Sequence, residues 1–197
     1  MNIVDALVLK NLKGVGDVSI TKLLELTGNE GINSLEELAK IGVENLPLRK
    51  VPKNLKEFLS SGKFEVERLH TKDELCAWNT QGVKVIYRHS EEYPKQILDL
   101  EDPPPFLFCK GNMSLLKNTR AIAVVGTRNN SPKGALIATK TVEAFHNRKF
   151  FIVSGLALGI DTIAHKTALK FGAPTVAVLV DLSKISPATN RDLAEQI

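Results

Sequence analysis

The chain has 197 residues, a length typical of one or two domains. Hydrophobic residues make up 43% of it and charged residues 24%, which excludes a disordered chain and a disulfide-stapled miniprotein. No apolar run approaches the roughly 18 residues of a membrane-spanning helix. The first five residues lack the basic start of a signal peptide. We therefore expect a cytoplasmic protein in which Cys76 and Cys109 are reduced thiols.

The net charge of +4 comes from one segment. Residues 121–172 carry seven basic side chains against two acidic ones, whereas the residues before them are balanced and those after them carry one excess acid. A local basic field of this kind favours a polyanionic ligand. A solvated, lysine-rich helix face explains the same charge and is the preferred interpretation on charge alone.

Residues 1–70 are predicted to form a small helical domain of the helix-hairpin-helix or SAM-like type. The spacing of apolar residues predicts helices at 3–9, at 18–26 with an end at Thr27-Gly28, at 35–41 and at 53–59. Between the first two helices lies a Gly-Val-Gly turn in which Gly14 and Gly16 follow Lys13. Its backbone N–H groups could bind a DNA phosphate. The balanced charge of this region favours a structural or protein-interaction role instead.

Residues 71–197 are predicted to form an α/β domain. Strands are expected at 83–87, 106–109, 121–125, 150–153 and 175–180, and helices at 93–100, 132–147, 160–170 and 190–197. The alternation of strand and helix after residue 120 is typical of a Rossmann-like, doubly wound parallel sheet. The continuous apolar run Ala121–Val125 suits a strand buried on both faces.

Two glycine-bearing loops follow the first two strands of this sheet, and ligands of such sheets bind beyond the carboxyl ends of the strands. The loops are Gly126-Thr127-Arg128 and the segment 154–161. Both lead into helix N-termini, and the Arg128 guanidinium can hold a phosphate through two hydrogen bonds. The sequence therefore predicts a phosphate-binding crevice here.

Common catalytic motifs are missing from the sequence. Ser154 lacks the Gly-x-Ser-x-Gly context of a hydrolase nucleophile, and neither a P-loop nor a Gly-x-Gly-x-x-Gly motif occurs. We expect Asp161 to be a helix N-cap and His165 to make a structural hydrogen bond between its helix and the loop. A metal or acid–base role for His165 is less favoured, because no third ligand or nucleophile stands nearby in the sequence. These absences argue against a hydrolase, a P-loop ATPase and a dinucleotide oxidoreductase, and we expect no cofactor and no metal.

Several motifs, in colinear order, resemble the DNA-processing protein A family (DprA, also called Smf). They are Tyr93-Pro94-x-x-Ile97-Leu98, Asp102-Pro103-Pro104, Leu107-Phe108-x-x-Gly111, Val125-Gly126-Thr127-Arg128 and Ser154-Gly155-Leu156-Ala157-x-Gly159-Ile160-Asp161-x-x-Ala164-His165. Together with the helical N-terminus, the resemblance covers residues 5–197.

The resemblance implies a Rossmann-like core that binds single-stranded DNA in a basic pocket, and a binding protein rather than an enzyme. Members of the family typically dimerise and load the RecA recombinase onto incoming strands during natural transformation, so single-stranded DNA, RecA and a second copy are the implied partners. Arg128 matches the family arginine that contacts DNA phosphate. The full implied set is Gly126, Thr127, Arg128, Ser154, Gly155, Leu156, Ala157, Gly159, Asp161, His165 and Lys166.

The chain departs from the family pattern in two respects. After the third strand, Pro187 and Asn190 match, but a glycine is absent and Ser186 replaces a tyrosine that could stack on a base. The family core also continues for roughly a hundred residues, so we expect a C-terminally shortened sheet that ends in an open edge strand. A natural short relative, a truncated gene product and an expressed fragment all fit this pattern.

Three functions stay open from the sequence. The first is single-stranded DNA binding of the DprA type. The second is a small-nucleotide site, although the Pro-Gly-Gly-x-Gly-Thr motif of the related enzymes is absent. The third is a non-binding fragment or an adaptor acting through its helical domain. Salt dependence separates the first two, because strand binding through several phosphates weakens steeply with salt.

Overall fold

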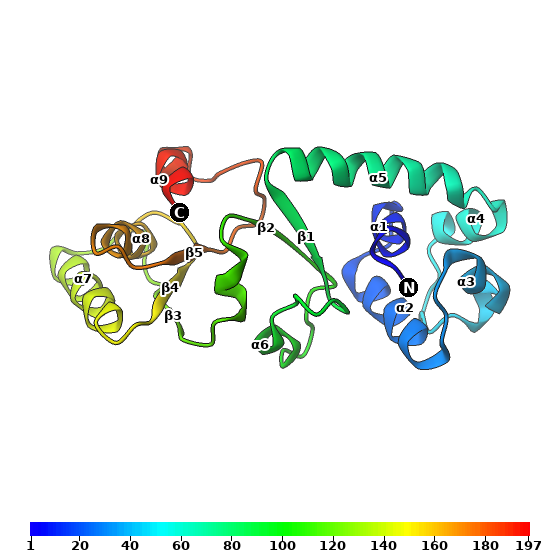
Figure 1. Cartoon of the computed structure of the whole chain (residues 1–197), viewed down its shortest axis with the longest axis horizontal. Helices are drawn as coiled ribbons and strands as arrows, with labels where there is room; N and C mark the ends of the chain where they lie inside the picture. The colour runs from blue at the N-terminus through cyan, green and yellow to red at the C-terminus, as the bar shows by residue number, and fades with distance from the viewer. The chain divides into compact units, whose positions relative to one another are not determined.

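The structure is a computed structural model that describes the backbone of residues 1–197 and the side chains of residues 1–26 and 31–197. It divides into two compact units, residues 1–117 and residues 118–197 (Figure 1). The expected domain boundary at residue 70 falls inside helix α5 (Phe64–Thr80). Helix α5 packs on both α1 (Ile3–Asn11) and strand β1 (Val83–Tyr87), so the helices and the first strands share one unit.

The helices of residues 1–117 surround a core of leucines. Besides α1 and α5 they are α2 (Asp17–Glu30), α3 (Leu35–Ile41), η1 (Val43–Asn45) and α4 (Lys53–Ser61). Leu7, Leu23 and Leu38, one from each of the first three helices, are completely buried. The four helices predicted from apolar spacing are confirmed, but the predicted end of the second at Thr27-Gly28 is wrong, because α2 continues to Glu30. Helix α5 was not predicted, because polar residues interrupt its inward face: Phe64 and Thr71 are buried, and Leu75 and Trp78 pack partly buried against the core.

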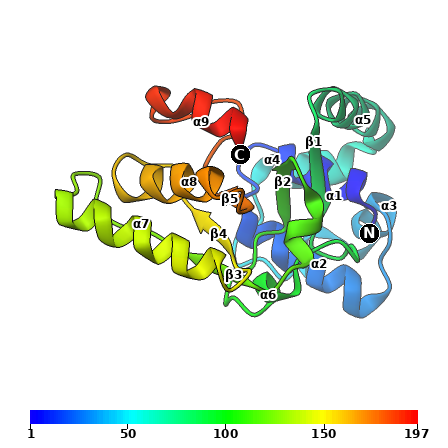
Figure 2. The ribbon, with the colours of Figure 1, turned by 60° about the vertical axis from the view of Figure 1, so that its left-hand side comes forward.

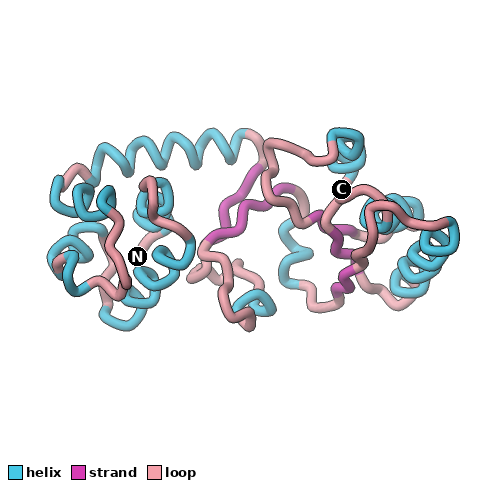
Figure 3. The backbone as a smooth tube through the Cα atoms, turned by 180° about the vertical axis from the view of Figure 1, so that it is seen from behind, coloured by secondary structure: helices cyan, strands magenta, loops and turns pink.

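A two-stranded antiparallel ribbon follows α5 directly (Figure 3). Strand β1 pairs with β2 (Phe106–Lys110). The connection between them holds the short helix α6 (Lys95–Leu98), and η2 (Met113–Lys117) ends the unit. The Tyr93 hydroxyl donates to the carbonyl oxygen of Pro104 at 2.7 Å, which ties the two ends of the connection together.

Residues 118–197 form a parallel sheet with strand order β3-β4-β5. The strands are β3 (Ala121–Ala123), β4 (Phe151–Ser154) and β5 (Thr175–Ala177), and the helices are α7 (Pro132–His146), α8 (Ile160–Lys170), η3 (Ala188–Asn190) and α9 (Arg191–Gln196). Helices α7 and α8 pack side by side (Figure 2). The predicted α/β class and the Rossmann-like parallel sheet are confirmed.

The sheet is covered unequally on its two faces. Because consecutive strands are neighbours and parallel crossovers are right-handed, α7 and α8 lie on the same face. Ile152 is buried under them, whereas Ala121 and Ala123 are exposed, as is Val125 just beyond β3. The prediction that Ala121–Val125 is buried on both faces is therefore wrong, because no reversal of strand order places a helix on the second face within the described residues.

Among the helices that the structure describes, none is both long and apolar enough to cross a bilayer. Cys76 is exposed and Cys109 half-buried, and both are free cysteines.

Candidate nucleic-acid interface

The two predicted loops meet at the carboxyl edge of β3 and β4. The Ile160 amide donates to the carbonyl oxygen of Thr127 at 3.2 Å. Gly126 lies so close to the Ile160 side chain that a Cβ there would come within 2.7 Å of its Cγ1. A Cβ on Gly159, whose φ is +80°, would overlap the Thr127 carbonyl oxygen. The loops are therefore joined by close backbone approach that glycine permits.

The first loop presents its residues to solvent. Gly126, Thr127 and Arg128 are all exposed. The Thr127 hydroxyl accepts from the Asn129 amide at 3.2 Å, and the Ser131 hydroxyl caps α7 by accepting from the Gly134 amide at 3.1 Å. Arg128 makes no hydrogen bond or ion pair with any residue that the structure describes. Its guanidinium is available to a ligand beside the N-terminus of α7.

Asp161 holds the second loop together. Its buried carboxylate accepts from the amides of Gly155 and Ala157 at 3.2 and 3.4 Å. The N-cap of α8 is Gly159, so the predicted N-cap role of Asp161 is wrong. The loop folds back over the first turn of the helix, which brings loop amides to the carboxylate in place of the amides of its own helix.

Ser154 and His165 lie inside the unit. The Ser154 hydroxyl donates to the carbonyl oxygen of Val124 at 2.6 Å. His165 is completely buried, and its Nδ1 lies 2.8 Å from the Thr175 hydroxyl at the start of β5. Burial lowers the pKa of His165, against the opposing effects of the Asp161 carboxylate and a hydrogen bond with the Ser154 backbone. These side chains position the strand ends, and any contact of theirs with DNA stays a prediction.

A residue from outside both loops anchors the second one. Asn190, which is buried in η3, donates to the carbonyl oxygen of Leu156 at 2.9 Å and to the Thr162 hydroxyl at 2.8 Å. Leu156 is completely buried and holds a φ of +58°, a left-handed conformation that is uncommon for residues other than glycine. Sequence reasoning matched Asn190 to the family pattern without assigning it a role. Its spacing after a strand gives no indication of the loop that it contacts.

The positive charge of the chain is concentrated in this unit and is not neutralised within it. Residues 118–197 carry a net charge of +5, and residues 1–117 carry −1. None of the cations in 118–197 makes an ion pair with a described side chain, whereas Lys10, Lys84 and Arg68 of the other unit each do. Lys166 is exposed on α8. The unit therefore offers unpaired positive charge to a polyanion.

The helix-hairpin-helix turn is arranged differently. Gly14 takes a φ of +87°, and the Lys13 carbonyl oxygen accepts from the Asn54 side chain at 3.0 Å. Asp17, the first residue of α2 after the N-cap Gly16, pairs with Lys10 at 2.9 Å. The N-terminus of α2 therefore already faces a carboxylate, which opposes binding of a second anion there.

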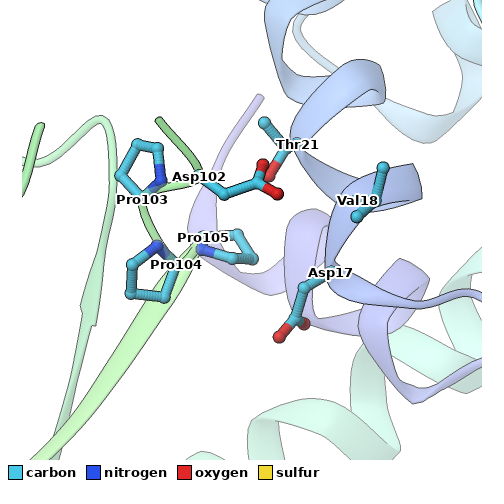
Figure 4. Close-up of a pocket in the computed structure, with 7 residues that line it drawn as sticks. All are labelled: Asp17, Val18, Thr21, Asp102, Pro103, Pro104 and Pro105. Atoms are coloured by element: carbon cyan, nitrogen blue, oxygen red, sulfur yellow. The ribbon is translucent and has the colours of Figure 1, made fainter. Parts of the chain in front are cut away.

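A small pocket of about 170 Å³ lies beside this turn (Figure 4). Asp17, Val18 and Thr21 line it from α2, and the Asp102–Pro105 segment lines it from the other side. Two carboxyl groups and no basic side chain contribute to the lining. This surface is unsuited to phosphate.

Comparisons with known proteins match this arrangement to one family. The family model of DNA recombination-mediator protein A matches residues 84–197, more than half of the chain. The DNA processing protein DprA of Bacillus subtilis is 35% identical over 138 residues, which cover 68% of this chain and 46% of that protein. DprA of Streptococcus pneumoniae is 42% identical over 106 residues, covering 53% and 37% of the two chains.

The fold comparison agrees. The X-ray structure of DprA from Streptococcus pneumoniae superposes with a TM-score of 0.78 and 30% sequence identity, over 99% of this chain and 64% of that chain. The chain spans less than half the length of the two relatives matched by sequence. On its sequence and its fold, the chain belongs to the DprA/Smf family of DNA-processing proteins.

Proposed function

We propose that this chain binds single-stranded DNA as a DprA-type protein of natural transformation, through the loops at the carboxyl edge of β3 and β4. The observation that carries the proposal is the exposed, unpaired Arg128 beside a loop fixed by Gly159. Around it lies a unit of net charge +5 without internal ion pairs among its described cations. Such a surface is suited to a flexible polyanion.

Recognition in this proposal is of the phosphate backbone and not of bases. Arg128 binds one phosphate through two N–H groups, and the positive end of the α7 dipole lies beside it. Ser154, Asp161 and His165 act behind this surface as positioning residues, because their side chains are buried and hydrogen-bonded. The proposed role is therefore binding without catalysis.

Two finer parts of the proposal rest on family membership alone. They are the loading of RecA onto the bound strand and the formation of a homodimer. A cytoplasmic location follows from the same role, because incoming strands meet recombinase there.

Fluorescence anisotropy with a labelled oligo-dT strand tests the proposal. We expect wild-type protein to prefer the single strand over a duplex competitor. Arg128→Ala should weaken binding about tenfold and lower the slope of log affinity against log salt by about 0.7, the value for one lost phosphate contact. Arg49→Ala, which removes an exposed arginine from the other unit, is the matched control.

Equal binding by Arg128→Ala and wild type, with circular dichroism showing both folded, would contradict the proposed site. A shallow salt slope together with competition by a nucleoside monophosphate would favour a small-nucleotide site instead.

A further inference from the structure

The opposite edge of the same sheet, where the strands begin, carries a second basic surface. We call it the amino-edge surface, and it consists of Arg120, Arg148, Lys149, Phe150, Lys170 and Phe171. The four cations are exposed, Phe150 is half-buried and Phe171 is 36% exposed. These residues come from the start of β3, the connection between α7 and β4, and the end of α8.

Contacts join some of these residues to one another and Phe171 to the neighbouring His146. The Arg120 guanidinium lies over the Phe150 ring, 4.7 Å from its centroid, and its Nη2 donates to the Arg148 carbonyl oxygen at 2.6 Å. The His146 ring stacks on Phe171 with a centroid separation of 5.9 Å. An arginine stacked on a partly exposed aromatic ring, as Arg120 is on Phe150, is a feature of surfaces that bind single-stranded nucleic acids.

Helix termini explain only part of this charge. Helices α7 and α8 both end here, and cations near helix C-termini are stabilising. Arg148 serves α7 in this way, because its Nη1 donates to the Ala144 carbonyl oxygen at 2.9 Å. Stabilising the C-terminus of α7 does not require a positive charge at Lys149. This residue also holds a φ of +61°, at which glycine or asparagine would be less strained. Arg120 directly precedes β3 and does not lie at a helix terminus.

We propose that the amino-edge surface binds the phosphate backbone of the same single strand, beyond the segment held at the carboxyl edge. The proposal rests on the proposed function. Helix α7 connects the two edges, and its 15 residues span about 22 Å at 1.5 Å per residue. A very short strand that occupies the carboxyl edge therefore does not reach the amino edge, whereas a longer strand does.

Strand length makes this testable by anisotropy on the full chain. The probes are two oligo-dT strands. One has about 4 nucleotides, at the short end of the usual range of binding-site sizes, and the other has about 20 nucleotides, beyond the long end. The variants are Arg148→Gln with Lys149→Gln and, separately, Lys170→Gln. The matched control is Arg49→Gln with Lys50→Gln, an adjacent, exposed arginine–lysine pair in the other unit. Thermal unfolding verifies that each variant is folded.

We expect the Arg148/Lys149 variant to bind the long strand about three- to tenfold more weakly, with a salt slope lowered by about 1.4, and to bind the short strand like wild type. Lys170→Gln should have the same effect at about half the slope change, and the control should have none. Arg128→Ala should weaken the binding of both the short and the long strand.

The other outcomes separate the two proposals. If Arg128→Ala weakens binding but the amino-edge variants bind the long strand like wild type, the amino-edge surface is overturned and the proposed function stands. If Arg128→Ala binds like wild type and only the amino-edge variants bind more weakly, the carboxyl-edge site is overturned. If wild-type protein binds neither strand at low salt, both proposals fail.

Discussion

Gly159 lies directly against the carbonyl oxygen of Thr127, so that no side chain fits between the second loop and the first. Its φ of +80°, a backbone conformation that residues with a side chain rarely adopt, is a second reason why glycine is required here. The position of Arg128 next to the loop 154–161 therefore depends on a residue that carries no charge. A substitution at Gly159 should therefore disrupt the contact between the two loops without changing the charge of residues 118–197.

Gly159→Ala should destabilise residues 118–197 by about 2–4 kcal/mol, because overlap with the Thr127 carbonyl adds to the cost of a left-handed alanine. Hydrogen-exchange mass spectrometry of peptides from 118–197 measures the loss. Gly172→Ala is the control, since its φ is +67° and a Cβ there has no neighbour within 4 Å. The control should cost only about 1–2 kcal/mol. Equal losses in the two variants would show that the loop contact adds nothing.

Asn190→Ala should speed hydrogen exchange in the loop 154–161. The free energy of opening this loop should fall by about 1–3 kcal/mol, because the buried carbonyl oxygen of Leu156 loses its hydrogen-bond donor. Asn190→Asp should not rescue it, since a carboxylate would face that carbonyl. Asn129→Ala, an exposed position, serves as the control. Unchanged protection of the loop in Asn190→Ala would show that the anchor is dispensable.

Acidification should destabilise residues 118–197 through His165. Burial holds the folded-state pKa of His165 below its usual 6.5, so the unfolded chain takes up the proton first. The stability that comes from this difference is present above about pH 6.5 and falls as the pH drops below that value. His165→Gln should flatten the pH profile of hydrogen exchange in this unit, and His70→Gln, at an exposed position, should leave it unchanged. If the pH profile of hydrogen exchange in His165→Gln matches that of wild type, His165 is not the group responsible for the acid sensitivity.

Arg68 should be essential to the helical unit. It pairs with the fully buried Asp5 from α1 and with Glu36 from α3. Arg68→Met leaves the Asp5 carboxylate buried without its partner, and we expect a loss of about 3–5 kcal/mol. Fluorescence of Trp78, which lies in the same unit, follows urea unfolding. Lys72→Met removes an exposed cation from the same helix and should cost little.

The same arginine controls the acid stability of this unit. Its hydrogen bond is the main reason that the pKa of Glu36 is lowered from 4.5 to about 2. The resulting stabilisation is present above pH 4.5 and is lost as the pH falls toward 2. Glu36→Gln should remove this part of the pH dependence of urea unfolding. If its profile between those values matches wild type, Glu36 is not the responsible group.

The sequence by itself determined the local elements and the order of the motifs. Apolar periodicity located the first four helices, and strand–helix alternation with glycine-bearing strand ends located the loops at 126–128 and 154–161. These features depend on neighbours a few residues apart, and such spacing is visible in one sequence. The resemblance to the DprA family rested on the same short motifs and is confirmed.

The tertiary structure decided which of these residues face solvent and which hold the others in place. Ser154, Asp161 and His165 belong to the same motif as the exposed loop residues, yet packing of α8 on the sheet buries them. Helix α5 packs on α1 and β1 through a face of mixed polar and apolar residues, and Asn190 reaches its loop from beyond β5. Burial and hydrogen bonding between segments tens of residues apart depend on how the elements pack, and no local periodicity records that.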